Sequence, residues 1–181
     1  MSRTEATTDI DLGMLTARVT TVDGATPADR AATADLARGA RLAYNIGVHT
    51  GASAEAILGA LDPEGICVSC DPYLDDRDAW AAAVPPLVAL NVFMTRARPY
   101  GHRSKLYIGT SLELAALAKP QSADLVFIDA DHSYGAVKQD IDAWRPIVKP
   151  GGYLAGHDFD KRMLEWPLDE VMSHRDEAAT R

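Results

Sequence analysis

Cysteine is scarce in this sequence, with only Cys67 and Cys70 in 181 residues. Their C-x-x-C spacing is typical of zinc and redox sites, but the chain has no second cysteine pair to complete a zinc site. Both lie in a short apolar run that is typical of a β-strand, where residues three apart point to opposite faces. We therefore expect two buried, unpaired thiols.

Long apolar runs and an excess of basic charge are also missing. No stretch approaches the roughly 18 apolar residues of a membrane span, and the polar start Met1–Glu5 lacks the apolar core of a secretion signal. The net charge of −8 argues against a nucleic-acid surface. We expect a cytoplasmic protein with neither a membrane nor a nucleic-acid partner.

One basic cluster interrupts the acidic chain between a predicted helix and a predicted strand. Its members are Arg96, Arg98, His102, Arg103 and Lys105. The cluster is typical of a solvated connection, and a site for an anionic substrate or partner is the alternative.

The length and composition suit one globular domain. Hydrophobic residues make up 47% of the chain and charged residues 24%, as in ordinary soluble domains, and 181 residues can bury a substantial core. We expect an irregular lead-in over residues 1–25 and a single domain over residues 26–181, without internal repeats.

The chain is organised around Tyr44–Ser53, where an apolar run meets a glycine turn and then a helix. Residues 41–46 predict a buried strand, and the following helix places four apolar residues on one face: Ala54, Ile57, Leu58 and Leu61. A strand, a glycine turn and a helix open a nucleotide-binding α/β sheet. Gly47 and Gly51 form G-x-x-x-G rather than the G-x-G-x-x-G of dinucleotide sites. A glycine pair by itself can also serve helix–strand packing alone.

Further strands alternate with helices along the chain. We expect the strands at 66–70, 105–108, 123–129 and 153–156, with a turn at 149–152 before the last. The first helix should begin at the N-cap Thr26 and run to about Arg38. A late helix should be capped by Asp131 or Ser133 and bury Val137, Ile141 and Trp144. The alternation predicts an α/β fold with a doubly wound, mostly parallel sheet in the order 3-2-1-4-5.

Polar and acidic residues gather where these strands end, at the edge where parallel sheets bind ligands. They are Gly47–Gly51, Asp71, Gly109–Ser111, Asp129–His132 and His157–Asp158. Asp71 stands 20 residues after Gly51 at the end of the second strand. An acid there accepts hydrogen bonds from the hydroxyls of an adenosine ribose; a helix-capping role is the alternative.

These motifs together resemble class I S-adenosylmethionine-dependent methyltransferases over about residues 26–159. The resemblance rests on four features: Asn45-x-Gly47-x-x-x-Gly51, Asp71, the run Phe127–Tyr134 (FIDADHSY), and Lys149–Gly152 followed by Gly156–Phe159 (GHDF). The similar branch includes metal-dependent catechol and macrolide-sugar O-methyltransferases. It implies a Rossmann-like methyltransferase fold and methyl transfer to a hydroxyl of a small molecule.

The resemblance also implies roles for individual residues. Asn45, Gly47, Val48, His49 and Gly51 would surround the methionine and ribose of S-adenosylmethionine, Asp71 would hold the ribose, and Thr110 and Ser111 would lie near the adenine. Asp129 would contact both cofactor and reacting groups. Asp129, His157 and Asp158 would bind a divalent ion, most simply Mg²⁺. Without an ion, His132 would act as the base.

This chain departs from the family pattern at several positions. An acid usually stands at the position of Asn45, often a glycine at that of His49, and an acid in several relatives at that of His157. The last two strands of the family have no evident counterpart, which leaves the fifth strand at an edge. The segment Met163–Met172 or a second subunit, with a homodimer favoured, is expected to cover that edge.

Two other functions remain open. A nicotinamide-dependent oxidoreductase uses a similar sheet, although the G-x-x-x-G spacing and the lack of a Y-x-x-x-K pair disfavour it. A degenerate relative that binds a cofactor or partner without catalysis is the other.

Overall fold

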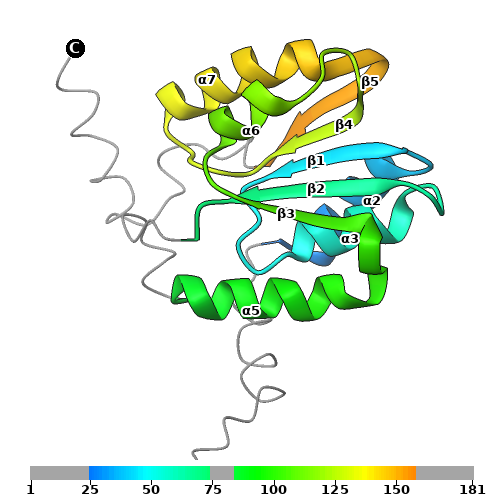
Figure 1. The fold of residues 1–181 in the computed structure, drawn as a ribbon, viewed down its shortest axis with the longest axis vertical. Coiled ribbons are helices and arrows are strands. Elements are labelled where there is room, and N and C mark those ends of the chain that lie inside the picture. Colours follow the sequence, from blue (N-terminus) through cyan, green and yellow to red (C-terminus); the bar gives the residue numbers. More distant parts are fainter. Residues whose placement is uncertain (1–24, 74–83, 158–181) are drawn as a thin grey trace, which may run out of the picture.

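The computed structural model describes residues 25–73 and 84–157, which form a parallel sheet between two layers of helices (Figure 1). The elements in chain order are α2 (Pro27–Ala37), β1 (Leu42–Ile46), α3 (Ala52–Ala60), β2 (Ile66–Asp71), α5 (Pro86–Ala97), η1 (Arg98–Arg103), β3 (Ser104–Ile108), α6 (Ser111–Leu117), β4 (Ala123–Ile128), α7 (Tyr134–Trp144), η2 (Arg145–Ile147) and β5 (Val148–Gly156). Residues 1–24 of the predicted lead-in, Asp158 and the segment Met163–Met172 lie outside the described residues.

The sheet has five parallel strands in the order β3-β2-β1-β4-β5. This confirms the predicted α/β class and strand order. Within the described residues β5 has β4 as its only neighbour in the sheet, and Tyr153 on it is 54% exposed.

Each face of the sheet packs against its own helices, because side chains alternate along a strand. Leu125 and Phe127 of β4 face a core with α2 and α3, while Val126 and Ile128 face a core with α6 and α7. Cys67 and Cys70 divide in the same way and are both free and buried. Burial raises the pKa of both thiols to about 12. The prediction of buried, unpaired thiols is confirmed.

The helices begin where the cap residues indicate. Thr26 and Asp29 form a capping box at α2, and Ser133 rather than Asp131 caps α7. Asp131 accepts the Ser133 N–H at 2.7 Å, which forms the turn before the helix. The four apolar residues predicted for α3 are all buried.

The predicted burial of Ile141 is wrong, while that of Trp144 is confirmed. Ile141 of α7 is 41% exposed, whereas the neighbouring Asp140 is buried. The helix turns Asp140 inward because the Asp140 carboxylate bonds the hydroxyl of Ser111, which also accepts the Trp144 indole N–H at 2.8 Å. A polar network therefore joins α6 to α7.

The turn predicted at 149–152 lies inside β5. The strand begins at Val148, and its register against β4 shifts between Ala123 and Leu125. Gly151 has a φ of 81°, which allows an irregular pairing there. Pro150 lacks an N–H but is tolerated at an irregular position of an outer strand.

Two members of the basic cluster are bonded within the protein. Arg96 has a side chain only 8% exposed and donates to the carbonyl and hydroxyl of Thr50, both at 3.3 Å. Arg103 donates to the carbonyls of Leu58, Asp62 and Gly65 at 3.0–3.1 Å. These guanidinium groups hold the ends of α3 rather than forming an open anion site. Among the described residues, no helix is long and apolar enough to cross a membrane.

Candidate functional site

The carboxyl ends of the parallel strands meet at one edge of the sheet and carry most of the predicted site residues. Backbone hydrogen bonds continue the strand pairing one residue beyond the strands: Gly47 N to Cys70 O at 3.0 Å, Gly109 N to Asp71 O at 3.2 Å, Asp129 N to Ile46 O at 2.7 Å and His157 N to Ile128 O at 3.1 Å. The first residue of each connection is therefore held in place by the neighbouring strand.

Asp71 holds the glycine loop. One carboxylate oxygen accepts the backbone N–H groups of Val48 and His49 at 2.9 and 2.8 Å, and the other accepts the N–H of Tyr73 at 2.9 Å. A carboxylate offers about four acceptor positions, so these three bonds leave room for about one more donor. Asp71 thus has a structural role that the sequence did not reveal, and contact with a ribose stays a prediction.

The loop donates most of its N–H groups to the protein. Gly47 donates to β2, Val48 and His49 donate to Asp71, and Gly51 donates to the carbonyl of Val48 at 2.8 Å. A pyrophosphate needs such N–H groups, and here a carboxylate already occupies two of them. The loop therefore suits a ligand without phosphates.

Both loop glycines are required by close packing. A Cβ at Gly47, where φ is 80°, would lie 1.9 Å from the carbonyl oxygen of Asp129. A Cβ at Gly51, where φ is 87°, would lie 2.8 Å from the ring of Phe93 in α5. The packing interpretation of the glycine pair holds, and close approach of a ligand remains a prediction.

His49 and Tyr73 have left-handed backbones, both with φ of 47°. The Tyr73 hydroxyl donates to the carbonyl of His49 at 2.7 Å, so the two strained residues support each other. Burial raises the pKa of Tyr73, which keeps its proton available for this bond. Non-glycine residues with such backbones are uncommon and cluster at functional sites. A left-handed backbone also suits the glycine that the family often has at the position of His49.

Asn45 is fully buried beneath the loop on β1. Its amide donates to the hydroxyl of Ser53 at 3.0 Å, while its Oδ1 accepts no hydrogen bond from the described residues. Buried polar atoms normally have partners, so Oδ1 is an acceptor with capacity for a bound donor group.

The predicted adenine-side pair is engaged within the protein. Thr110 caps α6 in a capping box with Glu113, and the Ser111 hydroxyl is shared by Trp144 and Asp140. Both hydroxyls therefore bond to groups of the protein itself, and their proximity to adenine stays a prediction.

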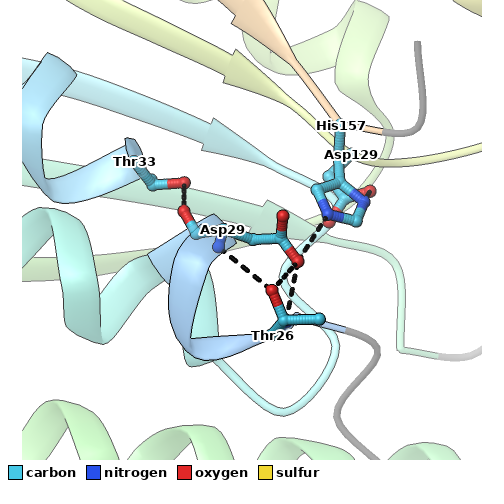
Figure 2. A network of polar contacts seen from close by, with 5 residues as sticks. All are labelled: Thr26, Asp29, Thr33, Asp129 and His157. Atoms are coloured by element: carbon cyan, nitrogen blue, oxygen red, sulfur yellow. Dashed lines mark hydrogen bonds and ion pairs between the residues drawn. The ribbon is translucent and has the colours of Figure 1, made fainter. Parts of the chain in front are cut away.

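Asp129 and His157, two of the predicted metal ligands, lie close together at the ends of β4 and β5. His157 Nδ1 lies 3.7 Å from Asp129 Oδ1, and its Nε2 lies 3.5 Å from Asp29 Oδ2 at the start of α2 (Figure 2). Bonds from Thr26, and then the nearby His157, lower the pKa of Asp29. Within 25–73 and 84–157, no group of three acidic, histidine or cysteine side chains could hold an ion. Asp158, the third predicted ligand, lies outside those ranges.

His132, the predicted base, stands in the same connection between β4 and α7 as Asp129. Its side chain is half-buried, and its catalytic role stays a prediction.

Three contributors were missed by the sequence analysis. Tyr73 follows the Asp71-Pro72 turn, Asp140 sits in a helix, and Asp29 lies in the first turn of α2. Asp29 and His157 are 128 positions apart, so no local spacing could pair them.

Comparison with known proteins places these features among methyltransferases. A family model described as "Methyltransferase domain" matches residues 44–159. No curated protein matches the chain significantly. Among solved structures, a methyltransferase from Geobacter sulfurreducens has a TM-score of 0.63 at 17% identity and covers 92% of this chain and 80% of its own.

Two further structures were solved with a cofactor or its product. An O-methyltransferase from Bacillus cereus in complex with SAH has a TM-score of 0.58 at 15% identity, covering 94% of this chain and 77% of its own. TomG, an O-methyltransferase from Streptomyces achromogenes involved in tomaymycin synthesis and solved with SAM, has a TM-score of 0.59 at 18% identity, covering 94% and 78%. At these identities the likeness concerns the fold, and it confirms the predicted Rossmann-like methyltransferase fold.

Proposed function

The chain belongs to the methyltransferase domain family, whose model matches residues 44–159, and from this premise we propose that it transfers a methyl group from S-adenosylmethionine to a hydroxyl of a small molecule, assisted by a divalent ion. The observation that carries the choice of donor is the glycine loop. Its N–H groups are bonded to Asp71 and to backbone carbonyls, which disfavours the pyrophosphate of a nicotinamide dinucleotide. A carboxylate beside the loop instead favours a cationic ligand.

Bound S-adenosylmethionine supplies a sulfonium methyl group that is already activated for transfer. The residues of this chain then have to bind the donor and align the acceptor. We assign Asp71 to the ribose through its remaining acceptor position, and the buried Asn45 Oδ1 to a donor group of the ligand. Gly47, Val48, His49 and Gly51 line the same loop, with Thr110 and Ser111 on the adenine side.

A hydroxyl acceptor must lose a proton as it attacks. A divalent ion held by Asp129, His157 and Asp158 would lower the pKa of the hydroxyl and fix its direction. The fit among described residues is that Asp129 Oδ1 and His157 Nδ1 lie 3.7 Å apart, less than twice a metal–ligand distance of about 2.1 Å. Mg²⁺ is the simplest choice, and an imidazole ligand shifts preference toward Mn²⁺, Fe²⁺ or Zn²⁺. Without an ion, His132 takes the proton.

Calorimetry with S-adenosylhomocysteine and with NAD tests the donor. We expect the first to bind and the second not to, and the reverse result would establish the oxidoreductase alternative. Turnover on a panel of phenols and sugars then separates an enzyme from a degenerate binding relative. Activity that is unchanged by EDTA would show that the reaction needs no divalent ion, and His132 would then be the proposed base.

We further infer a cytoplasmic protein that forms a homodimer through β5. This strand lies at the end of the described sheet and exposes Tyr153, and an exposed edge favours association. The alternative cover, Met163–Met172, lies outside the described residues. Light scattering at micromolar concentration tests the dimer, and a monomer with freely exchanging β5 amides would rule out both forms of cover.

A further inference from the structure

The start of α3 is buried and has no side-chain cap. Its N-cap is Gly51, and its first three residues, Ala52, Ser53 and Ala54, are all buried. The first N–H groups of a helix have no partner within the helix, and a buried start needs one from a side chain, water or a ligand. No side chain in the described part of the chain accepts from these three N–H groups. The helix start therefore favours an acceptor from outside the chain, and a negatively charged one most.

Asn45 determines how the hydroxyl of Ser53 can be used. Its Nδ2 donates to Ser53 Oγ at 3.0 Å, and Asn45 is 0% exposed. A hydroxyl has one proton to donate and two lone pairs. Because Asn45 occupies a lone pair, the Ser53 proton stays available, and none of the residues 25–73 and 84–157 accepts it. An acid, which the family usually has at the position of Asn45, only accepts hydrogen bonds and would take this proton itself.

The helix start and the Ser53 proton both favour an acceptor group of a ligand, while the Asn45 Oδ1 favours a donor group. An α-amino acid carries an acceptor carboxylate and a donor ammonium on one carbon, and S-adenosylmethionine ends in such a group. Glu55, the acid of the first turn of α3, is turned toward Arg96, with its Oε2 3.8 Å from the Arg96 Nε. The two kinds of unused group therefore match the amino-acid end of the proposed donor.

We propose that Asn45 is a positioning residue that makes Ser53 a hydrogen-bond donor, and that Ser53 and the start of α3 bind the carboxylate of the methyl donor. This inference rests on the proposed function and adds Ser53, which the predicted site did not contain. The neutral Asn45 acts on the carboxylate through Ser53 alone. Its replacement of the usual acid thus changes which group of the ligand the loop holds most strongly.

The test compares two ligands of the full-length protein by calorimetry. They are S-adenosylhomocysteine and its decarboxylated analogue, which keeps the amine and lacks only the carboxylate, so their affinity ratio measures recognition of the carboxylate. Ser53→Ala removes a hydrogen bond to a charged group and should lower this ratio by about tenfold or more. Asn45→Leu leaves the Ser53 hydroxyl without its partner and should lower the ratio by about fivefold, since a neutral hydrogen bond is lost.

The combined variant separates positioning from direct contact. Because Asn45 acts through Ser53, adding Asn45→Leu to Ser53→Ala should change the ratio by less than about twofold. The matched control is Ser69→Ala. Ser69 is the register partner of Asn45 on β2, is fully buried and lies 3.8 Å from the Cys67 Sγ, so its loss should leave the ratio unchanged. Asn45→Ala replaces Asn45→Leu if the larger side chain prevents folding.

The outcomes distinguish this inference from the proposed function. Equal ratios in the unmodified protein and in Ser53→Ala overturn the inference while the proposed function stands, and the Asn45 amide is then turned so that Oδ1 accepts the Ser53 proton. A variant that weakens both ligands equally acts on the fold alone and has the same meaning. A further fall of the ratio in the combined variant overturns the positioning role of Asn45. If S-adenosylhomocysteine does not bind the unmodified protein, the proposed function fails as well.

Discussion

Removing the Asp71 carboxylate should damage both the glycine loop and the binding of the donor. The side chain accepts three backbone N–H groups, from Val48, His49 and Tyr73. Bonds to a charged group contribute about 1.5–3 kcal/mol each. The site is partly exposed, so the low end applies, and Asp71→Ala should lower the free energy of unfolding by about 4.5 kcal/mol.

Asp71→Asn should cost less. One amide oxygen can still serve Val48 and His49 through two neutral bonds of about 1 kcal/mol each, while the amide group faces the Tyr73 N–H. The expected loss is therefore about 2.5 kcal/mol. Denaturant unfolding measures these values, and hydrogen exchange reports the Val48 and His49 amides. Asp62→Ala is the control, because Asp62 makes one exposed bond, to Glu64 N.

Ligand affinity separates the loop from the ribose. The 2′,3′-dideoxy analogue of S-adenosylhomocysteine lacks the ribose hydroxyls. It should bind the unmodified protein at least about tenfold more weakly than S-adenosylhomocysteine, since it loses about 1.5 kcal/mol or more of binding free energy. In Asp71→Asn the analogue should show no such loss of affinity. An equal penalty in both proteins would refute the ribose assignment. Unchanged stability and unchanged Val48 and His49 exchange in Asp71→Ala would refute the loop argument.

Three other substitutions test the fold around the site. Gly47→Ala places a Cβ 1.9 Å from a carbonyl at the end of β4 and should cost at least about 3 kcal/mol of stability, whereas Gly101→Ala, with a φ of 55° and nothing within 4 Å, adds backbone strain without a clash and should cost less by thermal unfolding. Arg103→Lys loses a fork that bonds three carbonyls and should cost about 1.5–3 kcal/mol, while the exposed Arg98→Lys stays near zero. Burial raises the pKa of Asp124, but bonds from a lysine and two backbone N–H groups outweigh it and leave the pKa below 3.8. The stability difference between the unmodified protein and Asp124→Asn should therefore be constant well above pH 3.8 and shrink as the pH falls through the lower folded pKa; a difference independent of pH would contradict this account.

The strands and their order were predictable because the signals for them are local. Apolar runs at 66–70 and 123–128 are bounded by turn residues, and alternation with helices allows few topologies. The same reasoning placed Asp71, Asp129 and His157 at one edge of the sheet. The start of β5 was missed because Pro150 and Gly151 are typical of a turn, and only pairing with β4 keeps them in a strand.

The sequence by itself determined the α/β class, the order of the sheet, the family and the edge at which most of the predicted site residues lie. Each of these follows from periodicity or motifs that span a few consecutive residues. Only the tertiary structure decided that Asp71 holds the loop, that Asp140 rather than Ile141 turns inward, and that Asp29 faces His157. Such pairs depend on how separate elements pack in space, and no local pattern encodes the distance between side chains that are many residues apart.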